Sequence, residues 1–301
     1  MTTRSITPFQ AFLMILAIVF WGSSFVVVKA TIGNGLTAIA LATFRFLVAS
    51  VLISIILLAR RAVNPNYSLA IDKKDLLILL ILALTGVTFF YIVQYTGIAL
   101  AGASIASILV CLLSPILITL FSLRIFKDKL TKRHAFGLAI AAFGTFSVIS
   151  ADLFGLQQNQ QLLMGTLILL STPVMWAIYS LLGEKMMNKY DPFLVVAYVT
   201  IIGGVCLVPF SFAEGSFFQI LTIGADAWFG ILYLAVTCSI LSYWIWFYVL
   251  KKAGSTTSSF LFGEPLVTAV FAAAFIGEKL TVFVISGAFL IFIAVYIVNS
   301  K

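Results

Sequence analysis

Glu264 is the residue whose position most demands a chemical explanation. It stands beside Pro265 in the apolar stretch 255–281. If that stretch crosses a membrane as a helix, the roughly nine residues before Glu264 place it about 13 Å deep, near the centre of a hydrocarbon layer about 30 Å thick. A charged side chain there costs on the order of 3 kcal/mol, so it is expected to face protein or a wet cavity and to mark a functional site.

Two roles are open for this carboxylate. Facing a cavity, Glu264 could exchange a proton or bind a cationic group of a substrate. Alternatively, it is permanently hydrogen-bonded and ties helices together beside a kink at Pro265, whose ring would deprive the Leu261 carbonyl of its helical partner. Lipid cannot replace that partner, so neighbouring helices or water must do so.

Arg45 is a second ionisable residue at mid-depth, about nine residues into the apolar stretch 36–59. Its guanidinium could take a substrate carboxylate by a two-point contact. Alternatively, it pairs with Glu264 or with freed backbone carbonyls. A lasting Arg45–Glu264 pair would lock the midplane and argue against coupling to protons.

Aromatic residues recur at similar depth in the first span of each half of the chain. Ser24 follows Trp21 by three positions, and Tyr179 follows Trp176 by three, so each pair shares a helical face. Such faces suit a pocket for a flat or amphipathic substrate. The alternatives are packing in lipid or core and, at residues 22–24, a helix contact between small residues.

A polar-aromatic cluster lies in the third expected span. Tyr91 and Gln94 are one turn apart and share a face, which predicts that both line the cavity. The related stretch of the second half contributes Tyr243. Tyr95 and Trp246 are expected instead to form part of an interfacial aromatic belt.

The two halves repeat each other at an offset of 150 residues, which relates Pro115 to Pro265. Both prolines, with Glu264, are candidates for coupling or gating. Ser114 matches Glu264, and could contact substrate or satisfy the backbone beside Pro115. The offset also relates Asp128 to Glu278, Lys129 to Lys279, Leu130 to Leu280, Thr131 to Thr281, Gly137 to Gly287 and Phe121 to Phe271. Such a set predicts two homologous halves.

Composition explains why a membrane is invoked. The chain is 62% hydrophobic and 9% charged, with a mean hydropathy of +1.18, whereas a soluble domain carries roughly a quarter charged residues. The first apolar run is too long for a signal peptide and is expected to be retained. Spans are predicted at 9–29, 36–59, 76–98, 104–123, 134–151, 162–183, 193–213, 227–250, 255–276 and 282–298.

The basic residues set the orientation of these ten spans. With both termini in the cytoplasm, all of the 18 Lys and Arg residues except Lys29, Lys279 and the intramembrane Arg45 lie on the cytoplasmic side. This topology explains the net charge of +8 without a nucleic-acid partner. Five spans per half make the repeats, 9–151 and 162–299, opposite in orientation. Inverted repeats are typical of secondary transporters, whose substrate site lies between the halves near the midplane.

Catalysis and cofactor chemistry find no support in the residue pattern. Cys111, Cys206 and Cys238 all fall within predicted spans without metal-ligand spacing, so neither a metal nor another cofactor is expected. His134 opens the fifth span at the cytoplasmic surface. No nucleophile with a base and no phosphate-binding glycine loop is present, so the protein is predicted not to be an enzyme.

Several motifs resemble those of the EamA family in the drug/metabolite transporter (DMT) superfamily. They are FLMILAIVFWGSSFVVVK (12–29), ALATFRFLVAS (40–50), SPILITLF (114–121) with KDKLT (127–131), and EPLVTAVFAAAFIGEKLT (264–281). The resemblance covers nearly the whole chain. It implies an all-α polytopic fold of ten transmembrane helices, as two inverted five-helix repeats around a central cavity used for alternating access.

We therefore expect a secondary active transporter in the plasma (inner) membrane that exports amino acids or related amphipathic compounds. Its expected partners are a small-molecule substrate, the lipid bilayer and protons as a coupling ion. Substrate identity, direction and oligomeric state stay open. The alternative is a membrane-embedded structural or enzymatic protein without transport activity.

Overall fold

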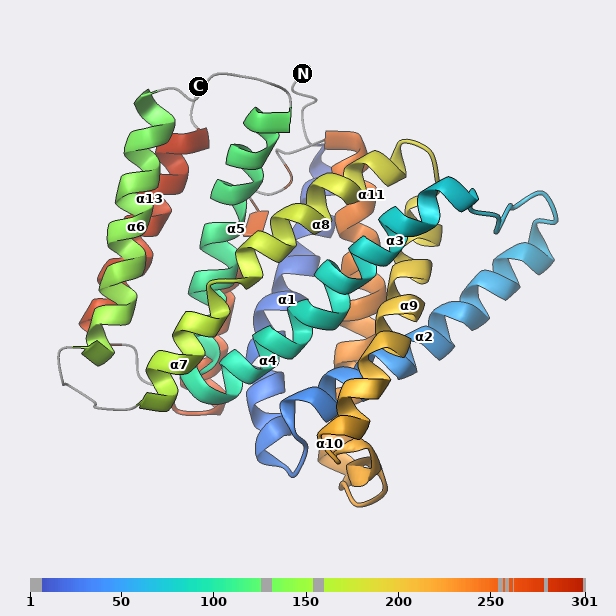
Figure 1. Cartoon of the computed structure of the whole chain (residues 1–301), viewed down its shortest axis with the longest axis horizontal. Coiled ribbons are helices and arrows are strands. Elements are labelled where there is room, and N and C mark those ends of the chain that lie inside the picture. The colour runs from blue at the N-terminus through green and yellow to red at the C-terminus, as the bar shows by residue number, and fades with distance from the viewer. Residues whose placement is uncertain are drawn as a thin grey trace.

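The protein is described here by a computed structural model covering residues 7–125, 132–153, 160–253, 257, 260–261, 263–278 and 281–299. Every regular element in these ranges is a helix. Seven helices are long and apolar enough to cross a membrane, and three shorter apolar helices join them. The helices cross the molecule back and forth, and α1 begins at the face where α13 ends (Figure 1).

The helices form two sets of five spans. The first set is α1 (Pro8–Gly33), α2 (Ala38–Val63), α3 (Leu76–Ala83) continued by α4 (Phe89–Ala101), α5 (Ala103–Ile125) and α6 (Lys132–Leu153). The second set is α7 (Gln160–Leu169) followed by α8 (Thr172–Met187), α9 (Pro192–Ala213), α10 (Ala225–Tyr233) continued by α11 (Tyr243–Ala253), α12 (Glu264–Phe275) and α13 (Val282–Asn299). Short 3-10 turns cover Lys73–Asp75 and Phe217–Leu221. The first set starts at the upper face in Figure 1 and the second at the lower face. This is the inverted ten-helix fold that the sequence predicts.

Helices of one set pack mainly against helices of the other. The largest contacts join α6 with α13, α2 with α9, α4 with α7, α5 with α8 and α1 with α12. Because lipid gives no hydrophobic drive for this packing, small residues and interhelical hydrogen bonds must hold the halves together. Since these inter-repeat contacts are the largest, the centre of the molecule lies between the two repeats.

Local sequence explains where several helices begin. The Thr7 hydroxyl accepts from the Gln10 N–H and the Gln10 side chain accepts from the Thr7 N–H, a capping box ahead of α1. Thr37 caps α2 by accepting from the Ala40 N–H. Asp191 accepts from two N–H groups at the start of α9, with Pro192 in the first turn.

The ninth span differs from its prediction. Helix α12 begins at Glu264, and the described residues Leu261 and Gly263 just before it lie in tight 3-10 turns. Pro265 is thus in the first turn of a helix, where its missing N–H costs nothing, rather than at a kink inside a helix. Its repeat mate Pro115 does lie inside a helix, α5.

Three other spans contain breaks that the sequence analysis missed. The sixth span is interrupted at Leu170–Ser171, between α7 and α8. The third and eighth spans each contain a wide π turn, at Leu84–Thr88 and Leu234–Ser242, and both turns start at positions related by the 150-residue repeat. Such turns occur often at functional sites because they shift the backbone hydrogen-bond ladder.

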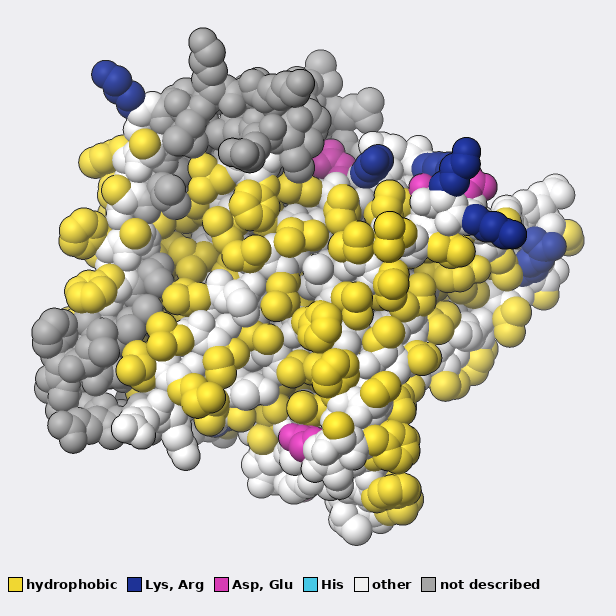
Figure 2. Space-filling model, in the orientation of Figure 1, with side chains coloured by type: hydrophobic (Ala, Val, Ile, Leu, Met, Phe, Trp, Pro, Cys, Tyr) yellow, Lys and Arg dark blue, Asp and Glu magenta, His cyan; other side chains and the backbone are white. Residues whose placement is uncertain are grey.

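Basic side chains gather on one face of the molecule, along the upper edge in Figure 2, while apolar side chains cover the middle. Arg60 and Arg61 close α2 at this face, and Lys251 and Lys252 close α11. We call it the basic face. The expectations for residues 128–131, 279–280, 255–256, 258–259 and 262 fall outside the described residues.

Candidate functional site

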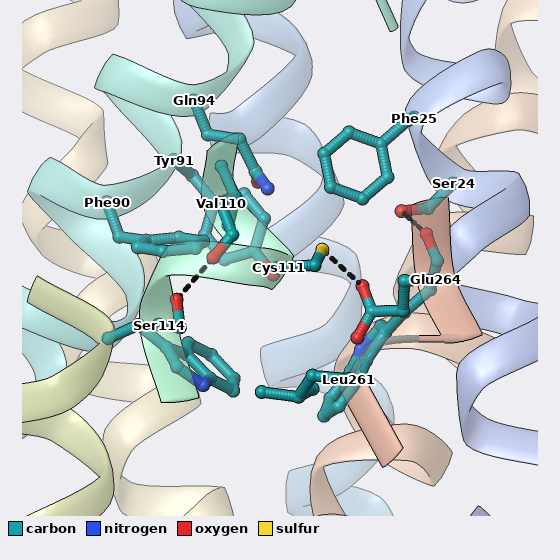
Figure 3. Close-up of a pocket in the computed structure, with 12 residues that line it drawn as sticks. Ser24, Phe25, Phe90, Tyr91, Gln94, Val110, Cys111, Ser114, Leu261 and Glu264 are labelled. Carbon is teal, nitrogen blue, oxygen red and sulfur yellow. Dashed lines mark hydrogen bonds between the residues drawn. The ribbon is translucent and has the colours of Figure 1, made fainter. Parts of the chain in front are cut away.

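A cavity lies between the two repeats at the level of Glu264 (Figure 3). Five spans line it: α1, α4, α5, α8 and the start of α12. Its free volume is about 40 Å³, room for a few water molecules at about 10–15 Å³ each, so the lining helices must move apart before a larger molecule can enter. The lining residues are Trp21, Ser24, Phe25, Phe90, Tyr91, Gln94, Val110, Cys111, Ser114, Trp176, Leu261 and Glu264.

Glu264 is held at the cavity wall with 4% of its surface exposed. Its Oε2 accepts a hydrogen bond from the Cys111 thiol of α5 at 3.1 Å, and Figure 3 shows the two side chains pointing at each other. As the first residue of α12, its carboxylate also meets the positive end of a helix dipole, which offsets part of the cost of placing a charge in the membrane.

Gly22 of α1 makes this position of Glu264 possible. A Cβ added at Gly22 would lie 2.7 Å from the Val267 Cβ and 2.9 Å from the Glu264 carbonyl oxygen. The Thr268 hydroxyl donates to the Gly22 carbonyl at 2.8 Å. The first turn of α12 therefore packs directly on the backbone of α1, as small residues allow in membrane helices.

Aromatic rings from both repeats form one wall. The Trp21 and Trp176 rings meet edge to face, 5.7 Å apart at 89°. The Trp21 indole N–H donates to the Cys238 carbonyl at 3.2 Å, and the Tyr243 hydroxyl donates to the Gly86 carbonyl at 3.1 Å. Both carbonyls belong to the π turns, so these turns supply the acceptors that orient the rings.

Arg45 lies behind this wall and does not line the cavity. It is 1% exposed, and its guanidinium donates to Ser239 (2.7 Å), Tyr91 (3.3 Å) and Tyr95. Its guanidinium carbon lies 4.4 Å from the Tyr91 ring centroid, a cation–π distance. The alternative that Arg45 pairs with Glu264 is therefore wrong. The ion pairs among the described residues do not include these two side chains, and Glu264 accepts a hydrogen bond from Cys111 instead.

The predicted site residues are divided between the cavity and the layer behind it. Seven line it: Trp21, Ser24, Tyr91, Gln94, Ser114, Trp176 and Glu264. Tyr243 and Tyr179 stand behind, within ring contact of Trp176. Tyr95 and Trp246 are 1% and 0% exposed, so their assignment to an interfacial belt is wrong.

Some lining residues were not predicted. Cys111 was not among the predicted site residues, although it lies one helical turn before Ser114 and so on the same face. Phe25, Phe90 and Val110 gave no signal, because apolar residues are common throughout the chain. Ser114 lines the cavity, and its hydroxyl donates to the Val110 carbonyl. Pro115 leaves the carbonyl of the next residue, Cys111, without its helical partner, so Ser114 bonds the backbone beside that carbonyl and not the carbonyl itself.

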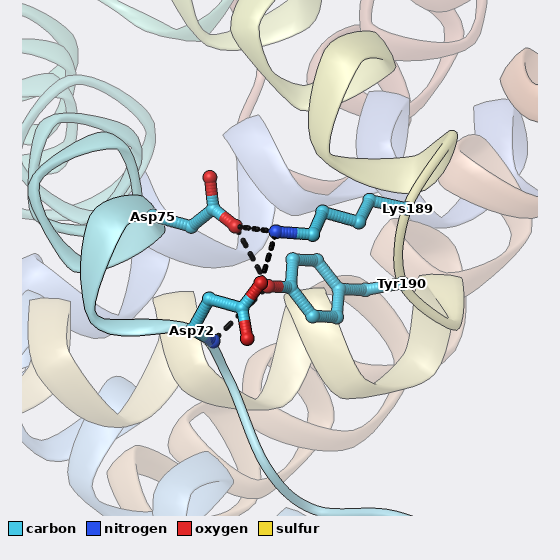
Figure 4. Close-up of polar contacts among 4 residues, drawn as sticks. All are labelled: Asp72, Asp75, Lys189 and Tyr190. Atoms are coloured by element: carbon cyan, nitrogen blue, oxygen red, sulfur yellow. Dashed lines mark hydrogen bonds and ion pairs between the residues drawn. The ribbon is translucent and has the colours of Figure 1, made fainter.

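Polar contacts join the two repeats at the basic face (Figure 4). The Lys189 ammonium bonds Asp72 and, at 2.6 Å, Asp75, and the Tyr190 hydroxyl donates to Asp75 at 2.7 Å. The two carboxylates, Asp72 first, raise the pKa of Lys189 above its usual range. We call this cluster the basic-face tie.

Nearby, the Tyr67 hydroxyl donates to Asp191 at 2.8 Å. Burial, followed by this bond to Asp191, raises the pKa of Tyr67 to about 12. The phenol therefore stays a hydrogen-bond donor throughout the physiological range and adds a second link between the repeats at this face.

Different contacts join the repeats at the opposite face. Glu278, between α12 and α13, accepts from the Ala103 N–H (2.9 Å), the Ser104 N–H (2.9 Å) and the Ser104 hydroxyl (2.5 Å). It thereby caps the N-terminus of α5. The Thr37 hydroxyl donates to Glu214 at 2.6 Å. We call the Glu278 contact the α5 cap.

Comparison with known proteins identifies the family. The model of the EamA-like transporter family matches residues 8–150 and 163–300. The chain belongs to this family. The two matched segments correspond to the two sets of five spans, and the cavity lies where EamA-like sequences from both segments meet.

Similar proteins carry transporter names. One from Archaeoglobus fulgidus, named an uncharacterized transporter, is 30% identical over 291 residues, 96% of each chain. One from Salmonella typhimurium, named "Probable amino-acid metabolite efflux pump", is 26% identical over 297 residues, 96% of this chain and 94% of that one. A solved crystal structure shares the fold, with a TM-score of 0.64 at 16% identity over 96% of each chain. The protein is therefore a membrane transporter of the EamA type. It lies in the lipid bilayer and acts on a small-molecule substrate.

Proposed function

We propose that this transporter is secondary active and exports small amphipathic metabolites, amino acids or their derivatives, from the cytoplasm. The observation that carries the proposal is the Glu264 carboxylate in a cavity built from both inverted repeats. A carboxylate at this depth is costly and is retained for a function. The name of the Salmonella relative supports outward movement of amino-acid metabolites.

Alternating access would arise from rocking of the two repeats, 9–151 and 162–299, about this cavity. The basic-face tie and the α5 cap hold the repeats together at opposite faces. Breaking one while keeping the other would open the cavity to one side. The basic face would be cytoplasmic, with both termini there and the protein in the plasma (inner) membrane, because Lys and Arg collect on cytoplasmic loops.

Glu264 would couple transport to protons by holding a proton in one half of the cycle and substrate in the other. The elements packed against it are α1 and α5. From α5 it meets the Cys111 thiol, and from α1 the neutral residues Trp21 and Ser24 line the same space. Pro265 and Pro115, at the helix start and inside α5, would act as gating points near the cavity.

Flux measurements in proteoliposomes test this proposal. Metabolites that raise the thermal stability of the purified protein are chosen first, because a ligand that binds only the folded state stabilises it. Each is then assayed for saturable uptake with simultaneous recording of internal pH. We expect wild type to move protons with substrate and Glu264→Gln to lose this movement. The exposed acid Asp226 of α10 offers a matched control, Asp226→Asn, which should behave as wild type. Substrate-dependent proton movement that persists in Glu264→Gln would refute the role of Glu264.

A further inference from the structure

The cavity presents one charge to whatever enters it. Among the described residues that line it, Glu264 alone has an acidic or basic side chain. Its described hydrogen-bond partner is the thiol of Cys111, which is a weak donor. A buried carboxylate is stabilised well by a cation or by several strong donors. The site is therefore incomplete in a way that a positively charged ligand group would complete.

The rest of the lining also suits a cation. Aromatic faces attract positive charge, most strongly where water is excluded. Five of the lining residues carry such rings: Trp21, Phe25, Phe90, Tyr91 and Trp176. The remaining residues are apolar or neutral, and they would contact the uncharged body of a ligand.

A ligand carboxylate, in contrast, would meet no cationic side chain among the described residues that line the cavity. Arg45 is turned away, and its guanidinium already donates to Ser239, Tyr91 and Tyr95. The cavity wall does offer uncharged N–H groups as hydrogen-bond donors. The indole N–H of Trp176 is buried and has no hydrogen-bond partner in the described part of the chain. Gln94 adds a side-chain amide. Such groups suit a hydroxyl or carbonyl oxygen, and they do not neutralise a negative charge.

We infer that the cavity selects organic monocations: a primary amine on an aromatic or apolar body, with a neutral oxygen acceptor allowed and a free carboxylate disfavoured. This inference rests on the proposed transport function and narrows its substrate class. Amino-acid derivatives whose carboxylate is removed or esterified fall within the class, and the zwitterionic amino acids fall outside it.

The charge balance agrees with exchange against a proton. A proton or an amine neutralises the same carboxylate, so the site holds the same net charge with either one bound. A zwitterion would leave the charge of the site as it was before binding. The proton and the protonated amine therefore compete for Glu264, and the amine should bind less well as the pH falls.

Four ligands with one phenylethyl body and different charges test the selection. They are phenethylamine and phenylalaninol, both cations at neutral pH, phenylalanine, a zwitterion, and 3-phenylpropionate, an anion. Binding to the purified full-length protein in detergent is measured by isothermal titration. We expect both cations to bind about tenfold or more tighter than the zwitterion and the anion, because a desolvated carboxylate without a partner is costly.

Matched variants locate the selection. Glu264→Gln keeps an acceptor for the Cys111 thiol and removes the charge, so it should weaken cation binding about tenfold or more. Asp226→Asn should leave it unchanged. Trp176→Phe should weaken it, whereas replacement of the exposed Trp228 by Phe should not.

The outcomes separate this inference from transport itself. Tight cation binding without flux in liposomes would support the selection and refute the proposed export of such compounds. Saturable flux of phenylalanine that the two cations do not inhibit would refute the selection and leave transport standing. Binding of phenylalanine as tight as that of phenethylamine, or no binding of either cation, would overturn the inference.

Discussion

The α5 cap offers a direct test of how the cavity is closed. Glu278 accepts three hydrogen bonds from Ala103 and Ser104, and it holds the start of α5 against the segment that follows α12. Both helices contribute to the cavity, through Cys111 and Glu264. Glu278→Gln keeps the size of the side chain and one acceptor oxygen while it removes the negative charge.

The size of the effect follows from these bonds. Hydrogen bonds to a charged group contribute about 1.5–3 kcal/mol each, and a helix N-terminus adds up to about 1 kcal/mol more for an anion. Glu278 is only partly buried and Gln retains part of the contact, so we expect a net loss of about 2 kcal/mol. If the open state is a minor population, a loss of this size raises it about 30-fold.

Alkylation of Cys111 measures that population, because this thiol is 3% exposed and lies in the cavity. With Cys206 replaced by Ala and Cys238 by Ser, a membrane-impermeant maleimide is applied to one side of oriented vesicles. Glu278→Gln should speed alkylation about 30-fold from the face that carries Glu278. Asp226→Asn, an exposed acid at that same face, should not. An unchanged rate, or acceleration only from the basic face, would refute the assignment of Glu278 as a closing contact.

Three further predictions concern the framework of the site. Gly22→Ala should lower stability by about 1–3 kcal/mol and disturb Glu264, because the new Cβ meets Val267 and the α12 backbone; wild-type thermal stability and flux would argue against this contact. Lys189→Met should leave the unfolding midpoint close to that of wild type, since the tie is exposed, yet speed Cys111 alkylation from the basic face; acceleration from the other face would contradict the tie. Arg45→Lys should lower the unfolding midpoint although the charge is kept, because an ammonium cannot reproduce the guanidinium contacts to Ser239, Tyr91 and Tyr95; an unchanged midpoint would show that the charge alone suffices.

Sequence reasoning predicted the topology because lipid imposes strong rules on it. Span length, basic loops and a shared offset of 150 residues were enough for ten spans in two inverted sets. The depth of Glu264 and the shared face of Tyr91 and Gln94 were enough to place them at one cavity. Each of these inferences depends on position along a helix axis or around it, which a sequence records directly.

The start of α12 was missed because hydropathy cannot distinguish a spanning helix from a spanning segment of mixed geometry. Pro265 is compatible with a kink inside a helix and with a first turn. The polar run 255–259 of Ser and Thr was the available signal, since these residues favour caps and turns over helix interiors.

The partners of Arg45 were missed for a different reason. The choice among Glu264, a substrate carboxylate and a group of hydroxyls depends on the rotation of α2 relative to the helices around it. The π turn at Leu234–Ser242 brings Ser239 to the guanidinium. No residue pattern in the sequence predicts such a turn, although the π turn at Leu84–Thr88 shows that both repeats have one at the same place.

Protection of Cys111 by substrate tests most directly whether the cavity beside Glu264 is the transport path. Alkylation of the single-cysteine protein and uptake of the same substrate are measured in proteoliposomes over one concentration range. A transported substrate that passes beside Glu264 should slow alkylation, with half-maximal protection at the concentration that gives half-maximal flux. Saturable flux without any protection, or full flux after complete alkylation of Cys111, would show that the substrate travels elsewhere.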